Sequence, residues 1–519
     1  MNPDKQDQPI EPTGNASAPD RIVGDSIAIG IVFALLMTVV QRLVGFGRGI
    51  MFCRMMPDDQ LGQWSMIYSF LMLLAPLAVL GLPGTFGRYV EHYRQQGALG
   101  YFLAKITRIC IATAVSVSVL MALFPEFFSW LIFRETHASS TIYMMASAML
   151  SVAIFNYVTS LLEALCQVRL VSLMRFISGI GFAIFGLSLA VVWHNQVEGV
   201  ILGFALGCGA GTLPGIVYLI KYRSSFRASN DATAKPLSPI WKKIIPFASW
   251  MWIINLVSNV YEVADRSMLL HLSRGTDQEV QSFVGQYHSG RVLPLMLVGV
   301  AVVLYGFLMP YMTAFWEKQQ FEKARQQLRW TIKAVGVGFT GIGLMMLLAS
   351  PFLFDVVLQG RYQDGLAVLP LTLVYCVWYS LVTVGQDYLW CAEKGKLAVL
   401  AVAFGLVVNI AFNFVLIPFY GLYGAVTATA ISNLVCLVAL FRFNQSQGFR
   451  MDLGTWLTIL MPLVLLLPGW SSGYAMILLL IIIWRTEWIF SAEEKYELAN
   501  FVGKGLARFS RRTERQVSA

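Results

Sequence analysis

Long apolar stretches recur along this chain, and they constrain its fold more than any other feature. About 14 of them lie between Gly24 and Trp484, and most have the roughly 18 to 25 residues that a helix needs to cross a bilayer. Charged residues make up only 13% of the chain, about half the share of a soluble domain, so a soluble fold could not cover its own surface. Outer-membrane barrels show alternation over about ten residues instead. The sequence therefore predicts an all-α polytopic membrane protein with about 14 transmembrane helices.

The basic residues indicate topology rather than nucleic-acid binding, although the net charge is +9. With the N-terminus inside, most of the 38 Lys and Arg residues fall in inside loops or the C-terminal tail, and the outside loops hold only Arg48, Arg54, Arg134, Arg274 and Arg361. This bias follows the positive-inside rule. We expect both termini to be cytoplasmic, the location to be the cytoplasmic (inner) membrane, and no nucleic-acid partner.

Polar segments divide the apolar stretches into two halves of six helices. The expected organisation is a disordered cytoplasmic tail (1–23), an N-terminal lobe (24–220), a cytoplasmic inter-lobe loop (221–243), a C-terminal lobe (244–441), two further helices (455–485) and a basic cytoplasmic tail (486–519). The first tail lacks the apolar region of a signal peptide. We expect helix 2 to begin at Gln63 and helix 8 at Gly285.

A short internal repeat supports this division. The segment LGQWS (Leu61 to Ser65) stands at the start of the second helix, and VGQYH (Val284 to His288) stands at the corresponding place in the second half. Six helices return the chain to its starting side, so the two lobes form a parallel pseudo-repeat. Parallel repeats around a central cavity are typical of transporters.

Five segments then resemble one family. They are MPDDQLGQW (56–64), GLPGTFGRYV (81–90), ADRSMLL (264–270), CAEKGKLA (391–398) and LIPFYGLYGAVTATAIS (416–432). The chain in these places resembles the polysaccharide (O-antigen or exopolysaccharide repeat-unit) flippase branch of the multidrug/oligosaccharidyl-lipid/polysaccharide (MOP) exporter superfamily. The resemblance implies two six-helix lobes around a cavity. It also implies a flippase that moves polyprenyl-pyrophosphate-linked oligosaccharide from the inner to the outer leaflet by alternating access. It allows polysaccharide polymerase or assembly proteins as partners.

Four arginines are candidates for a cationic substrate-binding cavity. Arg42 lies in the first helix, Arg48 in the flexible GFGRG that follows, Arg266 in the seventh helix and Arg291 in the eighth. A charge inside a span is costly, so it indicates function where it occurs. The alternative for the first two is snorkelling to the interface, and the alternative for the last two is an ion-pair cluster that locks the outer gate.

Four acids are candidates for ion coupling: Glu163, Glu262, Asp265 and Asp387. An acid in low dielectric can bind a proton or Na⁺. For Glu163 and Asp387 the alternative is an acid in water or one paired with a loop Lys or Arg. For Glu262 and Asp265 it is the ion-pair cluster at the outer gate. We expect no cofactor beyond a proton or Na⁺ gradient, and no metal site, because the seven cysteines are scattered.

For histidine and asparagine residues in and beside the spans, a structural role is favoured over a functional one. We expect His271 and His288 to be solvent-exposed residues at the ends of a loop. Asn409 and Asn413, one turn apart, face the cavity or form hydrogen bonds across helices; the second interpretation is favoured.

Three other functions remain open at this point. A drug antiporter of the same superfamily would need an acid-rich cavity, whereas the spans here are at least as cationic as acidic. A peptidoglycan lipid-precursor flippase would share the fold and the cavity charge. A membrane enzyme such as a polymerase would need a long outer loop with catalytic residues. The outer loops are short and no P-loop is present, so we expect a protein that is neither an enzyme nor ATP-driven.

Overall fold

A computed structural model describes residues 27–95, 98–134, 139–193, 195–222, 240–469, 471–492 and 494–495 of the chain. These residues form helices and turns and contain no strand. The predicted N-terminal tail (1–23), nearly all of the inter-lobe loop and most of the basic C-terminal tail lie outside the described residues.

The first half contains six long helices. They are α1 (Ile27–Met55), α2 (Asp58–Ala78), α4 (Leu99–Leu123), α6 (Ser139–Ala164), α7 (Val168–Val192) and α8 (Gln196–Lys221). Three short elements connect them: η1 (Leu82–Thr85), α3 (Phe86–Gln95) and α5 (Pro125–Phe133).

The second half repeats this pattern with more interruptions. It contains α10 (Ile240–Leu272), α11 (Asp277–Val292), α12 (Leu295–Glu317), α13 (Phe321–Pro351), η2 (Phe352–Val357), α14 (Gln363–Gly385), α15 (Asp387–Cys391) and α16 (Gly395–Ser446). The C-terminal segment follows as α17 (Leu453–Leu460), η3 (Met461–Leu466) and α18 (Ser471–Arg485).

The described helices fit the predicted number of spans. Nine of them are long and apolar enough to cross a membrane, and α11 with α12, bent by 50°, makes a tenth. The 52-residue α16 covers two predicted spans, which meet at Gly421, a residue with the left-handed φ of 50°. α17 and α18 begin the two shorter apolar stretches, and α10 supplies the seventh predicted span. The prediction of an all-α polytopic protein with about 14 helices is confirmed.

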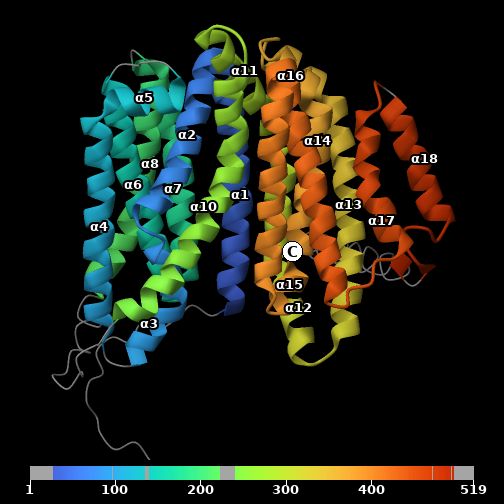
Figure 1. The fold of residues 1–519 in the computed structure, drawn as a ribbon, viewed down its shortest axis with the longest axis horizontal. Helices are drawn as coiled ribbons and strands as arrows, with labels where there is room; N and C mark the ends of the chain where they lie inside the picture. The colour runs from blue at the N-terminus through green and yellow to red at the C-terminus, as the bar shows by residue number, and fades with distance from the viewer. Residues whose placement is uncertain are drawn as a thin grey trace, which may run out of the picture.

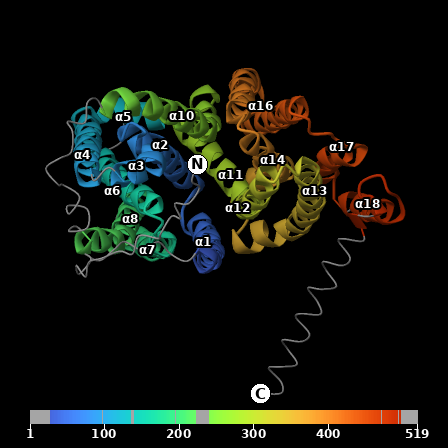
Figure 2. The ribbon, with the colours of Figure 1, turned by 90° about the horizontal axis from the view of Figure 1, so that it is seen from below.

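The helices form two lobes that stand side by side (Figure 1). One lobe contains α1 to α8, and the other contains α12 to α16, with α17 and α18 at its far side (Figure 2). Helix α10 runs diagonally and packs on η1, α2 and α16. The helix that opens the second half therefore contacts both lobes. The end of the molecule with α5 and the start of α11 is called the outer end here, and the end with α3 and α15 the inner end, as the predicted topology has them.

Two predicted helix starts were wrong. Helix α2 begins at Asp58, five residues before Gln63, and α11 begins at Asp277, well before Gly285. Both helices open with polar first turns, which hydropathy does not detect. In α11 a capping box between Thr276 and the residue three positions into the helix satisfies free backbone N–H groups. The repeated GQ segments therefore lie inside helices, not at their ends.

A buried ion cluster attaches the C-terminal segment to the second lobe. Lys333 of α13 is 1% exposed, and its Nζ donates to Asp452 Oδ2 at 2.5 Å and to Glu494 Oε2 at 3.0 Å. Asp452 also caps α17 by accepting from the backbone N–H of Thr455 at 3.1 Å. Burial by itself would raise the pKa of Asp452, but the hydrogen bonds from Lys333 and Thr455 outweigh it and lower this pKa. We call Lys333, Asp452 and Glu494 the lysine cluster.

Candidate functional site: the cleft between the lobes

The lobes meet at the outer end through the two repeated segments. Gly62 of α2 and Gly285 of α11 let the two helices touch backbone to backbone. A Cβ on Gly62 would lie 2.0 Å from the carbonyl oxygen of Gln281, and a Cβ on Gly285 would lie 1.9 Å from that of Asp58. Both distances are far below any allowed contact, so only glycine fits. The internal repeat thus forms a pseudo-symmetric contact.

Polar side chains surround these glycines and join the lobes. The Asp58 carboxylate accepts from Ser282 Oγ at 2.6 Å and from Gln286 Nε2 at 3.2 Å. Gln63 Nε2 donates to Gln281 Oε1 at 2.7 Å. We call this α2–α11 contact the outer gate, and in this structure it is closed.

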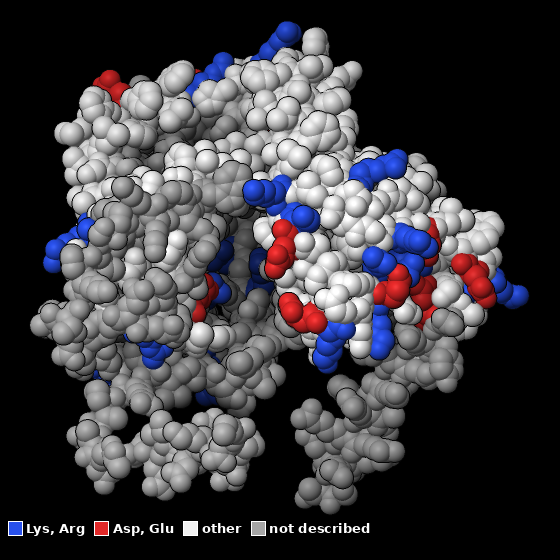
Figure 3. Space-filling view, turned by 60° about the horizontal axis from the view of Figure 1, so that its bottom comes forward, with Lys and Arg blue, Asp and Glu red and all other residues white. Residues whose placement is uncertain are grey.

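Figure 3 shows the molecule from the inner end, with a hollow between the described parts of the lobes in which blue Lys or Arg and red Asp or Glu side chains are visible. A closed contact at one end and a hollow at the other are typical of one state of transporters that work by alternating access.

Three of the four predicted arginines gather around one histidine behind the outer gate. Arg48 of α1, Arg266 of α10 and Arg291 of α11 all act electrostatically on His288 of α11. Arg266 and Arg291 are 8% and 7% exposed. The three arginines come from three helices and both lobes, and an anion bound among them would accept hydrogen bonds from their guanidinium groups. These four residues are called the arginine cluster.

Each arginine of the cluster is also held locally. The Arg48 guanidinium lies 4.0 Å from the centre of the Phe182 ring, and that of Arg291 lies 5.1 Å from the Tyr287 ring. Arg266 donates to Ser69 Oγ of α2, which ties α10 to the first lobe. Aromatic faces stabilise cations without neutralising them, so these ring contacts leave the guanidinium groups charged.

Arg42 lies apart from this cluster. Its side chain is exposed and runs beside Gly299 of α12, where its Cδ and Nε would come within 3.3 Å of a Cβ added at that glycine. It therefore faces the second lobe from α1. The structure brings Arg42 to the contact between lobes but does not join it to the arginine cluster.

Asp265, the residue before Arg266, is the centre of a second cluster. It is 4% exposed. Its Oδ1 accepts from Asn409 Nδ2 at 2.8 Å and from Asn413 Nδ2 at 3.0 Å, and its Oδ2 accepts from Tyr287 at 2.8 Å and Thr429 at 2.6 Å. Four neutral donors from α11 and both limbs of α16 stabilise the carboxylate. The favoured interpretation of the asparagines as cross-helix donors is consistent with these bonds. We call these five residues the aspartate cluster.

The remaining predicted acids have different surroundings. Glu163, at the end of α6, is exposed and pairs with Arg175, as the alternative interpretation had it. Asp387 is completely buried at the start of α15. The side chain of Glu262 lies outside the described residues, and its role stays a prediction.

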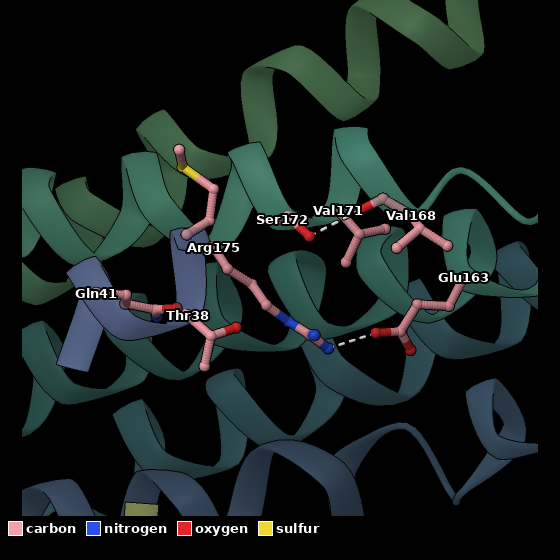
Figure 4. A pocket seen from close by; sticks show the side chains of 8 residues that line it. Thr38, Gln41, Glu163, Val168, Val171, Ser172 and Arg175 are labelled. Carbon is pink, nitrogen blue, oxygen red and sulfur yellow. Dashed lines mark hydrogen bonds and ion pairs between the residues drawn. The ribbon is translucent and has the colours of Figure 1, made fainter. Parts of the chain in front are cut away.

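Glu163 and Arg175 line a cavity of about 260 Å³ between α1, α6 and α7 (Figure 4). Thr38 and Gln41 approach from α1, and Ser172 lies on the α7 wall. Because the cationic and acidic groups of this cavity already pair with each other, it offers no net charge to an ionic ligand. It is separate from the arginine and aspartate clusters.

His288 was placed wrongly from sequence, and two members of the aspartate cluster were missed. His288 lies within α11, beside the arginines, because that helix begins eleven residues before it, at Asp277. Tyr287 and Thr429 carry no charge, so they gave no signal in apolar stretches. A usable signal for Tyr287 was its place beside His288 in the repeated segment.

The two lobes, the closed outer gate and the charged cleft are features of a multi-pass membrane transporter. The chain belongs to the polysaccharide biosynthesis protein family, which matches residues 27–316. It is therefore a flippase or transporter of the MOP superfamily, and the predicted resemblance is confirmed.

Individual relatives agree with this assignment. The lipid II flippase MurJ of Bacillus subtilis (strain 168) is 20% identical over 474 residues, which is 85% of this chain and 86% of that protein. A solved multidrug resistance MATE family transporter in an inward-facing conformation has a TM-score of 0.66 at 12% identity, covering 80% of this chain and 98% of its own. Lipid II flippase MurJ in an inward closed conformation has a TM-score of 0.60 at 14% identity, covering 88% and 98%. At these identities the structures show the fold alone.

Proposed function

We propose that this protein is a flippase for polyprenyl-pyrophosphate-linked oligosaccharide repeat units, moving them from the inner to the outer leaflet of the cytoplasmic membrane. The single observation that carries the proposal is the arginine cluster in the cleft between the lobes. The family assignment to polysaccharide biosynthesis supports it, and so does the lipid-linked cargo that the name of the Bacillus relative implies for that protein. No covalent step is involved, so the protein is not an enzyme.

The charge of the cluster fits a pyrophosphate. One arginine at the centre of a span costs about 2.5–3.5 kcal/mol on insertion scales, and the cleft contains Arg48, Arg266 and Arg291. Guanidinium groups bind phosphate oxygens through paired hydrogen bonds. Two phosphates bound among these arginines would accept such paired hydrogen bonds, while the polyprenyl tail stays in lipid and the sugars occupy the hollow between the lobes.

The aspartate cluster is proposed as the ion-coupling site. Its carboxylate has one negative charge and four neutral donors, and Asn413 Oδ1 is buried without a hydrogen-bond partner among the described residues. Carboxylate, amide and hydroxyl oxygens are the ligands of hard cations. A sodium ion or a proton taken up at Asp265 would exchange with the bonds from the asparagines and change how α10 packs on α16.

The test is a complementation experiment in the source cell. After deletion of the gene, lipid-linked oligosaccharide should accumulate on the cytoplasmic face, and wild-type protein should clear it. Arg291→Gln should fail to clear it, whereas the matched control Arg450→Gln, which changes an exposed arginine of the inner end, should behave as wild type.

Two other outcomes would replace the proposal. Accumulation of a peptidoglycan lipid precursor instead of oligosaccharide would assign the protein as a precursor flippase. A gain in sensitivity to cationic drugs with no trapped lipid would assign it as a drug antiporter, the class of the MATE structure.

A further inference from the structure

A second buried acid lies at the inner end of the second lobe, far along the chain from the aspartate cluster. Asp387 is the first residue of α15, directly after the break that separates α14 from α15 at Gln386. Its side chain is 0% exposed. Neither of its carboxylate oxygens has a hydrogen-bond partner among the described residues. This differs from Asp265, whose oxygens accept four hydrogen bonds.

The break next to Asp387 contains a second acceptor without a partner. Asn444 of α16 is 0% exposed, and its Nδ2 donates to the carbonyl oxygen of Gly385 at 2.9 Å. That bond replaces one that the break removes from α14. It directs the amide toward the residue two positions before Asp387, and Asn444 Oδ1 is left buried with no donor among the described residues. Asn444 Oδ1 and the two carboxylate oxygens of Asp387 are thus buried acceptors to which no described residue donates a hydrogen.

Among the residues that the structure describes, none contributes a positive charge that compensates an ionised Asp387. The elements packed against α15 are α12, α14 and α16. Two titratable groups interact electrostatically with Asp387, namely Tyr305 of α12 and Cys391 of α15 itself, and neither of them is a cation. The basic residues Lys396 and Arg442 of α16 are exposed, and the one acid of α14, Asp364, lies at its other end and is exposed too.

An ionised carboxylate buried without a partner is among the most costly arrangements in a protein, and such a group takes up a proton instead. We propose that Asp387 is a proton-binding site that is occupied in the outer-closed conformation. Release of its proton requires the carboxylate to reach water, and therefore a different packing of α15 on α12, α14 and α16. We expect this repacking to accompany the opposite conformation, with the outer gate open.

The consequence is a pH-dependent balance between the two conformations. The outer-closed state binds one more proton than the outer-open state, so raising the pH removes stability from the outer-closed state. For a single proton the ratio of closed to open molecules falls by at most about tenfold per pH unit. The proposal concerns the conformational cycle and does not depend on which lipid-linked molecule is carried.

The test measures the outer gate with the full chain in liposomes and no added substrate. Spin labels are placed on cysteines introduced at Asp59 and Gln278, whose side chains meet across the gate at 3.4 Å. The background variant is Cys166→Ser, since Cys166 is exposed and the other six cysteines are buried. Distances are read by pulsed electron resonance, because disulfide formation would itself depend on pH.

The expected result is that the short-distance population of wild type falls as the pH is raised. Asp387→Asn, which mimics the protonated acid, should keep the short distance throughout, and Asp387→Leu should do the same. Tyr305→Phe and the exposed-acid control Asp364→Asn should respond to pH as wild type does.

The proposal is overturned if wild type shows no pH response, or if both Asp387 variants respond as wild type does. It is also overturned if Tyr305→Phe removes the response while Asp387→Asn keeps it. Failure here leaves the accumulation of trapped lipid after gene deletion unaffected, so this proposal and the proposed cargo fail separately.

Discussion

The outer gate makes a specific prediction about Gly285. Its replacement by alanine would place a Cβ 1.9 Å from the carbonyl oxygen of Asp58 and 2.7 Å from the carbonyl carbon. These are backbone atoms of a facing helix and cannot rotate away. Gly285 lies inside a helix, where alanine is the better residue by about 1 kcal/mol. Any loss must therefore come from the α2–α11 contact and not from α11 itself.

The size of the effect follows from the cost of overpacking. Extra carbon atoms in a closely packed contact cost about 1–3 kcal/mol. The clash disappears when the gate opens, so this cost acts almost wholly on the closed state. It corresponds to a shift of about 5- to 150-fold in the ratio of open to closed molecules. The backbone nature of the clash places Gly285→Ala toward the upper end.

The assay is the distance distribution between labels at Asp59 and Gln278, with Gly209→Ala as the matched control. A Cβ at Gly209, a helical glycine of α8, would meet no atom within 4 Å. We expect Gly285→Ala to populate the long distance and Gly209→Ala to match wild type. An unchanged distribution in Gly285→Ala would refute the reasoning, since it would mean that α2 and α11 do not close the gate by direct backbone contact.

Three further predictions concern the aspartate cluster and the lysine cluster. Asp265→Asn should abolish the stabilisation of the folded protein by the coupling ion. For wild type this stabilisation reaches about 2.7 kcal/mol at an ion concentration of 100 times Kd. Thermal unfolding with and without Na⁺ measures it, and equal shifts of Tm in both proteins would contradict the assignment. Lys333→Met should lower the free energy of unfolding by about 3 kcal/mol, the lower end for a broken buried pair because Asp452 is 42% exposed. Adding Asp452→Asn and Glu494→Gln should restore most of this stability in denaturant unfolding. No recovery would count against the lysine cluster. Since the pKa of Asp452 is lowered on folding, its contribution to stability should be complete above about pH 4 and lost as the pH falls further. Proteolysis of the C-terminal segment at graded pH can follow this loss. Protection that stays constant with pH would contradict the prediction.

The fold could be predicted well because one physical constraint dominates it. A bilayer requires apolar helices of fixed length, and hydropathy reads that length directly. The same signal fails at polar helix ends, which is why the starts of α2 and α11 were misplaced. That error placed the half-buried His288 in a loop instead of inside α11. A capping residue such as Thr276, followed three positions later by Glu279, is the local signal that corrects the boundary.

The candidate site could be predicted only in its charged members. Arginines within spans are conspicuous because each is costly, and three of the four predicted ones do lie together around His288. The partners of Asp265 could not be inferred in the same way. Thr429 is 164 positions away in sequence and meets Asp265 only through the packing of α10 on α16. Neutral donors in an apolar stretch look like packing residues until the helices are placed.

Helix α10 joins the two clusters through consecutive residues. Successive side chains on a helix point about 100° apart, so Asp265 faces α16 while Arg266 reaches Ser69 on the opposite lobe. A cation at Asp265 alters the contact of α10 with α16, and an anion at Arg266 competes with its contact to α2. Neither ligand can bind without changing how α10 is held between the lobes. We infer that α10 is the element on which ion binding and head-group binding act together.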